Sequence, residues 1–329
     1  MRVCFPVSYT HLDVYKRQLF NSGVTGLTIG GSSTLLWTIS NGVCPSTNNS
    51  VTINVAATPD VSNAGSDQNL CNTTTATLAG NNPVNGTGVW TVTAGTAVVT
   101  TPTAFNSGVT GLTIGSFSTL QWTISNGSCA PSVSTVNINV AATPDVSNAG
   151  SDQNLCNTTT ATLAGNNLSL IHICNNPAPG TGLWTVLAGS AVVTTPTLFN
   201  SPVTGLTIGS TSNLVWTISN PGCAPSASAV NINVAATPDV SNAGSDQNLC
   251  NTTTATLAGN NPVNGTGLWT VTAGTAVVTT PTAFNSGVTG LTIGSFSTLQ
   301  WTISNGSCAP SVSTVTVSYT HLDVYKRQQ

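Results

Sequence analysis

Cysteine is the residue whose spacing in this chain points most directly to chemistry, because two thiols in an oxidising compartment form a disulfide. The chain has nine cysteines, of which Cys4 and Cys174 lie outside any repeated sequence. The cysteines that recur in register with a repeat are Cys44, Cys71, Cys129, Cys156, Cys223, Cys250 and Cys308. This usage predicts disulfides and an exported protein, extracellular or at the cell surface.

Two pairings fit the cysteine spacing. Within a copy of the repeat the two cysteines are 58 residues apart, once a nine-residue insertion is discounted. This scheme joins Cys71 to Cys129, Cys156 to Cys223 and Cys250 to Cys308. The alternative joins cysteines 27 residues apart across a copy boundary, such as Cys129 and Cys156. We expect the first, because a last strand of about eleven residues at ~3.3 Å each carries the chain roughly 36 Å from Cys129. A topology with the two cysteines of a copy at opposite ends would forbid it, since Cα atoms beyond ~7 Å cannot be bridged.

Aspartates recur in pairs, and a carboxylate with nearby Asn and backbone carbonyls can hold Ca²⁺. Two aspartates at this spacing fall short of a recognised calcium loop. We therefore expect them to cap turns, and we predict no metal and no cofactor. The weak calcium candidates are Asp60, Asp67, Asp145, Asp152, Asp239 and Asp246.

Tryptophans also recur, two in each complete copy, and could stack on sugars. They lie within alternating stretches of predicted strand, which favours burial, and truncating a buried Trp costs about 3 to 5 kcal/mol. We expect a core aromatic role for Trp90, Trp122, Trp184, Trp216, Trp269 and Trp301.

Catalytic residues are otherwise scarce. The chain has no Glu. When three foreign tracts are set aside, it also has no His, and it has no Lys or Arg after Arg2. Catalysis needs groups that exchange protons, attack or hold a metal, so the sequence predicts a protein that is not an enzyme. A chain without cations cannot neutralise phosphates, so we expect no nucleic-acid partner. No apolar run approaches the ~20 residues of a membrane span.

The elements that must position these residues follow from an exact repeat of 85 residues, for example from Trp184 to Trp269. Alternation in Leu120, Trp122 and Ile124 is typical of a half-buried strand. Shorter candidate strands lie at 75–79, 89–93, 96–101 and 109–114, bounded by turn residues such as Asn126-Gly127. We predict an all-β fold, a tandem array of antiparallel β-sandwiches of about seven strands each, with no helix.

The repeat divides the chain into unequal parts. We expect a truncated C-terminal half of a repeat at 19–57, complete repeats at 58–142 and 143–236, and a repeat with a truncated last strand at 237–316. The third copy carries an insertion at 168–176 in a turn, where a longer loop costs only about 1 kcal/mol or less. Short Ala-Ala-Thr-Pro joints predict that neighbouring repeats abut.

Three tracts do not belong to the repeat. The string VSYTHLDVYKRQ occurs at 7–18 and again at 317–328, and LSLIHIC occupies 168–174. These strings resemble translated transposon mosaic-end adapters used to prepare DNA for sequencing. We therefore treat 1–18 and 317–329 as a leader and adapter artefacts, outside the fold.

The repeat resembles a known class at Ala64–Gln68 (AGSDQ), at the Trp-containing strand and at Trp122–Cys129 (WTISNGSC). It is similar to the PKD-like and Ig-like repeats of very large secreted surface proteins of Bacteroidetes-type bacteria, although Ser66 stands where their pattern has Pro. The resemblance implies a non-catalytic spacer or adhesion stalk that binds an unknown surface ligand, a glycan or a protein. The alternative is an accessory carbohydrate-binding region of a secreted enzyme whose catalytic domain lies outside this sequence.

Overall fold

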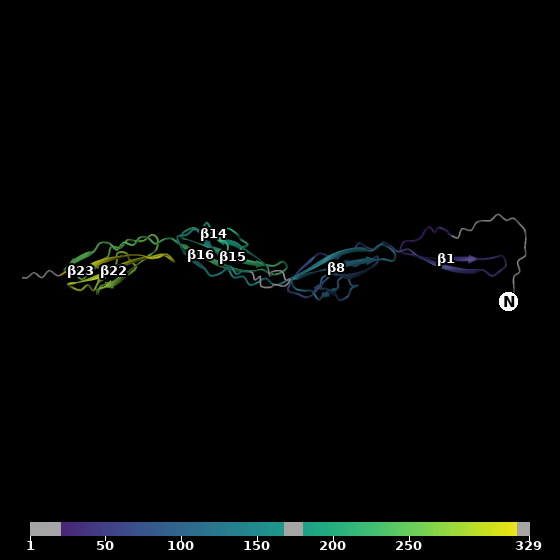
Figure 1. The fold of residues 1–329 in the computed structure, drawn as a ribbon, viewed down its shortest axis with the longest axis horizontal. Helices are drawn as coiled ribbons and strands as arrows, with labels where there is room; N and C mark the ends of the chain where they lie inside the picture. The colour runs from purple at the N-terminus through teal and green to yellow at the C-terminus, as the bar shows by residue number, and fades with distance from the viewer. Residues whose placement is uncertain (1–20, 168–179, 321–329) are drawn as a thin grey trace, which may run out of the picture. The chain divides into compact units, whose positions relative to one another are not determined.

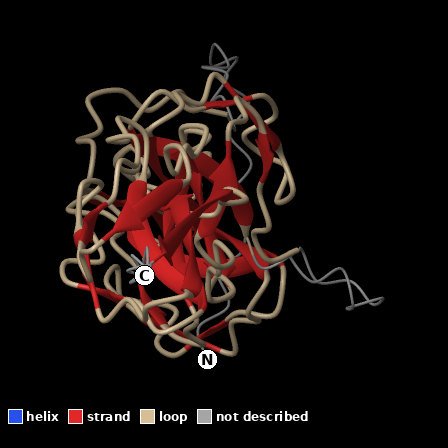
Figure 2. Cartoon of the chain, turned by 90° about the vertical axis from the view of Figure 1, so that its left-hand side faces the viewer, coloured by secondary structure: helices blue, strands red, loops and turns tan. Residues whose placement is uncertain are grey.

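The structure is a computed structural model that describes residues 21–167 and 180–320. Every regular element in this part of the chain is a β-strand (Figure 2). The chain divides into two compact units, Met1–Ala141 and Ala142–Gln329, which are considered separately. The first unit holds the first and second copies of the repeat, and the second unit holds the third and fourth.

The second copy shows the architecture of a complete repeat. Its strands are β3 (Gln68–Cys71), β4 (Ala76–Thr77), β5 (Thr87–Ala94), β6 (Val98–Val99), β7 (Gly108–Thr110), β8 (Ser116–Ser125) and β9 (Ser132–Ala141). They form a four-stranded sheet in the order β3-β9-β8-β5 and a three-stranded sheet in the order β4-β7-β6. This arrangement confirms the predicted all-β sandwich of seven strands.

One pairing differs from the expected antiparallel pattern. Strand β3 runs parallel to β9, with Gln68 opposite Ile138 and Cys71 opposite Ala141. The other pairings of this copy are antiparallel, including Trp90 opposite Trp122 across β5 and β8. The parallel strand is the element that places the first cysteine of the copy.

The core lies between the two sheets. Alternate residues of β8 and β9 point inward, and Leu120, Trp122 and Ile124 are buried with Val136 and Ile138. The ring centroids of Trp90 and Trp122 lie 4.9 Å apart, a separation at which tilted aromatic pairs attract. The structure places the six tryptophans predicted for the core in the interior of their repeats.

The third and fourth copies repeat this plan, each with its own core cluster. The third copy has β10 (Gln153–Cys156), β11 (Ala161–Thr162), β12 (Thr181–Ala188), β13 (Val192–Val193), β14 (Pro202–Thr204), β15 (Ser210–Ser219) and β16 (Ser226–Ala235). The fourth copy has β17 (Gln247–Cys250), β18 (Ala255–Thr256), β19 (Thr266–Ala273), β20 (Val277–Val278), β21 (Gly287–Thr289), β22 (Ser295–Ser304) and β23 (Ser311–Thr320). The tracts at 7–18 and 168–174 lie outside the described residues.

The expectation that the fourth copy loses the end of its last strand at residue 317 is wrong. Strand β23 continues to Thr320, through the first four residues of the foreign tract. Val317 and Tyr319 are buried in it, at the positions that Ile138 and Val140 hold in the second copy. The tract happens to continue the alternation of apolar residues, and alternation is what a strand with one buried face requires.

The first copy is a two-stranded antiparallel ribbon of β1 (Ser32–Ile39) and β2 (Thr47–Asn54) (Figure 1). These strands correspond to β8 and β9, and their apolar residues are the counterparts of core residues. Trp37 is 52% exposed, however, whereas its counterpart Trp122 is 0% exposed. The ribbon therefore exposes apolar side chains whose counterparts in the second copy are buried in the core.

Candidate functional site at the repeat junctions

The two cysteines of a copy lie at opposite ends of its sandwich. Because β3 is parallel to β9, Cys71 sits opposite Ala141, where the chain leaves the copy. Cys129 follows the turn between β8 and β9, where the chain enters. The ten residues of β9 separate the two ends, a distance of roughly 33 Å at ~3.3 Å per residue. We call cysteines of the first kind outgoing (Cys71, Cys156, Cys250) and those of the second kind incoming (Cys44, Cys129, Cys223, Cys308).

A disulfide joins the third copy to the fourth. Outgoing Cys156 is bonded to incoming Cys308, with Cα atoms 4.9 Å apart and a sequence separation of 152. The predicted pairs Cys156–Cys223 and Cys250–Cys308 are therefore wrong, and the alternative pair Cys129–Cys156 is wrong as well. The physical reason is the parallel first strand, which separates the partners within a copy.

The remaining predicted disulfide cysteines fall into two groups. Cys71 and Cys223 are disulfide-bonded. Among the described residues, Cys129 and Cys250 form no disulfide, so the predicted bond of Cys129 to Cys71 is also wrong.

Backbone geometry fixes the outgoing cysteine at the junction. Cys156 lies opposite Ala235 at the end of β16, and the next residue, Asn157, has φ 48°, a left-handed conformation that Asn tolerates. The Asn157 N–H donates to the Ala235 carbonyl at 2.8 Å, which ends the strand. The Cys308 sulfur lies 3.7 Å from the same carbonyl oxygen. Both sulfur-bearing residues are thus placed by Ala235, the first residue of the joint.

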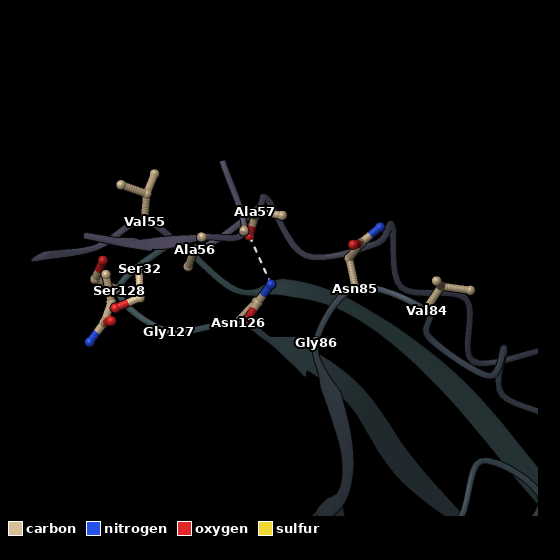
Figure 3. A pocket seen from close by; sticks show the side chains of 13 residues that line it. Ser32, Val55, Ala56, Ala57, Val84, Asn85, Gly86, Asn126, Gly127 and Ser128 are labelled. Atoms are coloured by element: carbon tan, nitrogen blue, oxygen red, sulfur yellow. Dashed lines mark hydrogen bonds between the residues drawn. The ribbon is translucent and has the colours of Figure 1, made fainter. Parts of the chain in front are cut away.

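An asparagine clamps each described joint. Asn305 Nδ2 donates to the Ala236 carbonyl at 2.9 Å. Asn126 holds Ala57 in the same way at 3.0 Å, and Asn220 holds Ala142 at 2.9 Å (Figure 3 shows the first of these). A satisfied hydrogen bond of this kind contributes about 0.5 to 1.5 kcal/mol. Sequence reasoning missed this role, although an Asn three residues before each incoming cysteine was a visible signal.

The turn that carries the clamp needs glycine in two copies. Gly127 and Gly306 have φ 56° and 52°, as expected for an Asn-Gly turn. A Cβ on Gly306 would lie 2.8 Å from the Cβ of Ala235, too close for two carbon atoms. The turn is therefore packed directly against the joint.

A polar hollow lies beside the joint in each unit. In the first unit it has a volume of about 780 Å³ and is lined by Asn54, Asn85 and Asn126 among backbone groups. Figure 3 shows Asn85 and Asn126 at this hollow. The equivalent hollow in the second unit is lined by Asn233, Asn264 and Asn305. No aromatic side chain is among the lining residues of either hollow, and the two tryptophans of each complete copy are buried elsewhere. Neither hollow therefore offers a stacking surface for sugars.

The first aspartate of a copy caps a turn. Asp60 accepts hydrogen bonds from the backbone N–H groups of Val84 and Asn85 and from Asn85 Nδ2. The backbone hydrogen bond from Asn85, then that residue's side chain, lowers the pKa of Asp60 below its usual value. Asp239 repeats this arrangement with Val263 and Asn264, and its pKa is also lowered, chiefly by the Val263 N–H. The loop that would contact Asp145 falls largely within 168–179, outside the described residues.

The second aspartate of a copy ties the segment before the first strand to the last strand. Asp67 accepts from the Asn137 N–H at 2.7 Å. Asp152 accepts from the Asn231 N–H and side chain, which lower its pKa, and Asp246 accepts from the Thr316 N–H. Within the described residues, no three His, Cys, Asp or Glu side chains gather to hold a metal ion. The described contacts make hydrogen-bond acceptors of Asp60, Asp67, Asp152, Asp239 and Asp246.

Comparison with known proteins gives distant structural likenesses and no family. No protein family matches the chain, and no curated protein matches it. Titin domains I67–I69 are 12% identical, with a TM-score of 0.42 over 81% of this chain and 99% of that one. The N-terminal eight Ig domains of Down Syndrome Cell Adhesion Molecule are 11% identical, with a TM-score of 0.45 over 88% of this chain and 40% of that one. The PKD domain of the KIAA 1837 protein is 21% identical, with a TM-score of 0.23 over 26% of this chain and 91% of that one. The chain is a tandem array of Ig-like sandwiches.

Residues 21–167 and 180–320 contain no helix that is long and apolar enough to cross a bilayer.

Proposed function

We propose that this chain is a non-catalytic spacer and adhesion stalk of a secreted or cell-surface bacterial protein. The observation that carries the proposal is the junction between the third and fourth copies. There a disulfide bonds one repeat to the next, and Asn305 holds the short joint between them. A spacer needs strong connections between modules, and in this chain a disulfide forms such a connection.

The chemistry of the repeat supports the proposal. Disulfides persist in oxidising compartments, which agrees with export. The aspartates are engaged with backbone donors, and the tryptophans fill cores, so neither set is arranged for catalysis or for sugar stacking. Any adhesive contact would then lie on exposed loops repeated along the array, with a surface protein or glycan as partner.

Pulling the full chain from its ends tests the mechanical part of this proposal. The Cys156–Cys308 bond closes a loop with a sequence separation of 152, and this loop cannot extend while the bond is intact. At ~3.3 to 3.6 Å per extended residue, the fully unfolded chain should be at least roughly 500 Å shorter when oxidised than when reduced. Single-molecule force spectroscopy in the presence and absence of a reductant measures this difference.

A matched control uses the cysteines without a described bond. The C129S/C250S double variant should keep the oxidised length, because neither residue forms a disulfide among the described residues. Equal lengths for the oxidised and reduced wild-type chains would refute a cross-linked spacer.

A further inference from the structure

The residue that follows the clamping asparagine differs between copies of the repeat. Asn126 and Asn305 are each followed by glycine, whereas Asn220 is followed by Pro221. All three asparagines hold their joints in the same way, through a hydrogen bond from Nδ2 to an alanine carbonyl. The same clamp therefore occurs with two kinds of following residue, and only glycine has a backbone N–H.

The turn accommodates both sequences because the residue with positive φ shifts by one position. Gly127 and Gly306 have positive φ at the first central position of the turn, which is typical of a type II′ turn. In the third copy Gly222 has φ 85° at the second central position, after proline, which is typical of a type II turn. In both forms the cysteine N–H closes the turn on the asparagine carbonyl, at 3.1 Å for Cys129 and 3.0 Å for Cys223. The third copy thus keeps the clamp without an N–H after the asparagine.

A backbone N–H that follows asparagine can attack the asparagine side chain. The backbone nitrogen forms a bond to Cγ, the Cγ–Nδ2 bond breaks, and Nδ2 leaves as ammonia with the proton of the attacking nitrogen. Water then opens the resulting succinimide to aspartate or isoaspartate, so water is the only co-reactant. Glycine favours the attack because it has no Cβ to hinder the approach of its nitrogen. Proline has no N–H to lose and cannot react in this way.

The structure leaves the attacking group available at both Asn-Gly turns. Gly127 and Gly306 are exposed, and their N–H groups donate no hydrogen bond within the described part of the chain. Figure 3 shows Asn126 beside Gly127, with its side chain bonded to the Ala57 carbonyl. This hydrogen bond must break before Nδ2 can leave. A single hydrogen bond of this kind lowers the open population by only about tenfold or less, so the clamp slows the reaction without preventing it.

The product of the reaction cannot form the clamp. An ionised carboxylate only accepts hydrogen bonds, so it cannot donate to the carbonyl of Ala57 or Ala236, and its charge repels that oxygen. Isoaspartate also adds a backbone carbon to a turn that packs directly against the joint, where a Cβ on Gly306 would already lie 2.8 Å from the Cβ of Ala235. Ammonia is lost to solvent, so the clamp is not restored.

We propose that Asn126 and Asn305 are self-modifying sites, at which the following glycine converts the asparagine to aspartate or isoaspartate and permanently releases the joint. Asn220 is the resistant counterpart, because Pro221 removes the attacking N–H. The inference concerns the covalent chemistry of the joints and does not depend on the proposed spacer function.

Peptide mapping of the full chain after incubation at mildly alkaline pH tests the reaction. Asn126 and Asn305 should convert at least about tenfold faster than Asn220, a difference of about 1.4 kcal/mol in activation free energy. The pairs Asn85-Gly86 and Asn264-Gly265, which lie away from the clamp, provide positive controls for the conditions. Conversion at these pairs without conversion at Asn126 and Asn305 would overturn the proposal, as would equal rates at the three clamping asparagines.

Exchanging the two turn sequences provides matched variants. G306P/S307G gives the fourth copy the Asn-Pro-Gly-Cys turn of the third, so Asn305 should keep its clamp and stop converting while Asn126 still reacts. P221G should make Asn220 react at a rate close to that of Asn126. Continued conversion of Asn305 in G306P/S307G would show that the glycine N–H is not the attacking group.

Hydrogen exchange tests the release of the joint. In N305D, and in wild-type chain after conversion, the joint segment 236–239 should exchange about two- to tenfold faster, as expected for loss of one hydrogen bond. Strand β22, which lies in the core, should be unchanged. The G306P/S307G variant should keep the exchange rates of the fresh wild-type chain after the same incubation. Unchanged exchange of the joint in N305D would refute the release.

Discussion

Replacing Gly88 by alanine should destabilise the second repeat alone. Gly88 lies on β5 under the Trp122 ring, and an added Cβ would overlap Cζ2 and Cη2 and lie 2.7 Å from Cε2. The backbone does not oppose the change, because Gly88 is not among the residues with positive φ. Trp122 has little room to move, since it is fully buried and packs against Trp90. The clash is therefore a side-chain effect.

The magnitude follows from two opposing contributions. Overpacking a core costs typically about 1 to 3 kcal/mol, and a rigid ring justifies the upper end. Replacing glycine in a strand returns roughly 0.5 to 1 kcal/mol of backbone entropy. The net loss is about 2 kcal/mol. At about 4 to 8 °C per kcal/mol for a domain of this size, one repeat should melt about 8 to 16 °C earlier.

Differential scanning calorimetry of the full chain measures this shift as one transition that separates from the others. Gly23→Ala is the control, because a Cβ there meets nothing within 4 Å. A double-mutant cycle with Trp122→Phe locates the cause, since the smaller ring lacks the overlapping atoms. The cost of Gly88→Ala should then fall close to zero, a coupling of about 2 kcal/mol. Additive effects of the two substitutions would refute the reasoning.

Two further predictions concern the aspartates. Hydrogen bonds lower the pKa of Asp60 and Asp239 below the usual value of 3.8, so their stabilising effect is present above that value and is lost as the pH falls through the folded-state pKa. Urea unfolding of D60N/D239N should therefore depend less on pH than wild type between about pH 5 and pH 2, and parallel profiles would contradict this assignment. Millimolar Ca²⁺ should raise the Tm by less than about 5 °C, because the Asp60 oxygens already accept protein donors; a larger rise would instead identify a calcium site.

Sequence periodicity predicted much of the sandwich because its long strands alternate strictly. The pattern of Leu120, Trp122 and Ile124 predicts strand β8, and the tryptophans lie in the core that this pattern indicates. Strand β3 gave no such signal, because Gln68–Cys71 has only four residues. Only one of them is apolar enough to mark a buried face. Its parallel pairing arises from tertiary contact with β9, and that pairing decides which end of the repeat carries each cysteine.

The contacts at the junction could not be predicted from the sequence for the same reason, because they depend on tertiary structure. Cysteine spacing is compatible with several pairings, and only the placement of chain ends distinguishes them. The Asn126 clamp depends on a joint that is adjacent in space but 69 residues away in sequence. The foreign end of β23 shows the converse case, since four residues with the right alternation complete a strand whatever their origin.

The Cys156–Cys308 bond gives the joint at Ala235–Pro238 a second covalent path. A protease that cut this joint would leave both fragments attached through sulfur, with no loss of mass from the assembly. Separation of the third and fourth copies would require reduction as well as proteolysis. In the proposed stalk, the part beyond this joint would be released only where both a protease and a reductant are present.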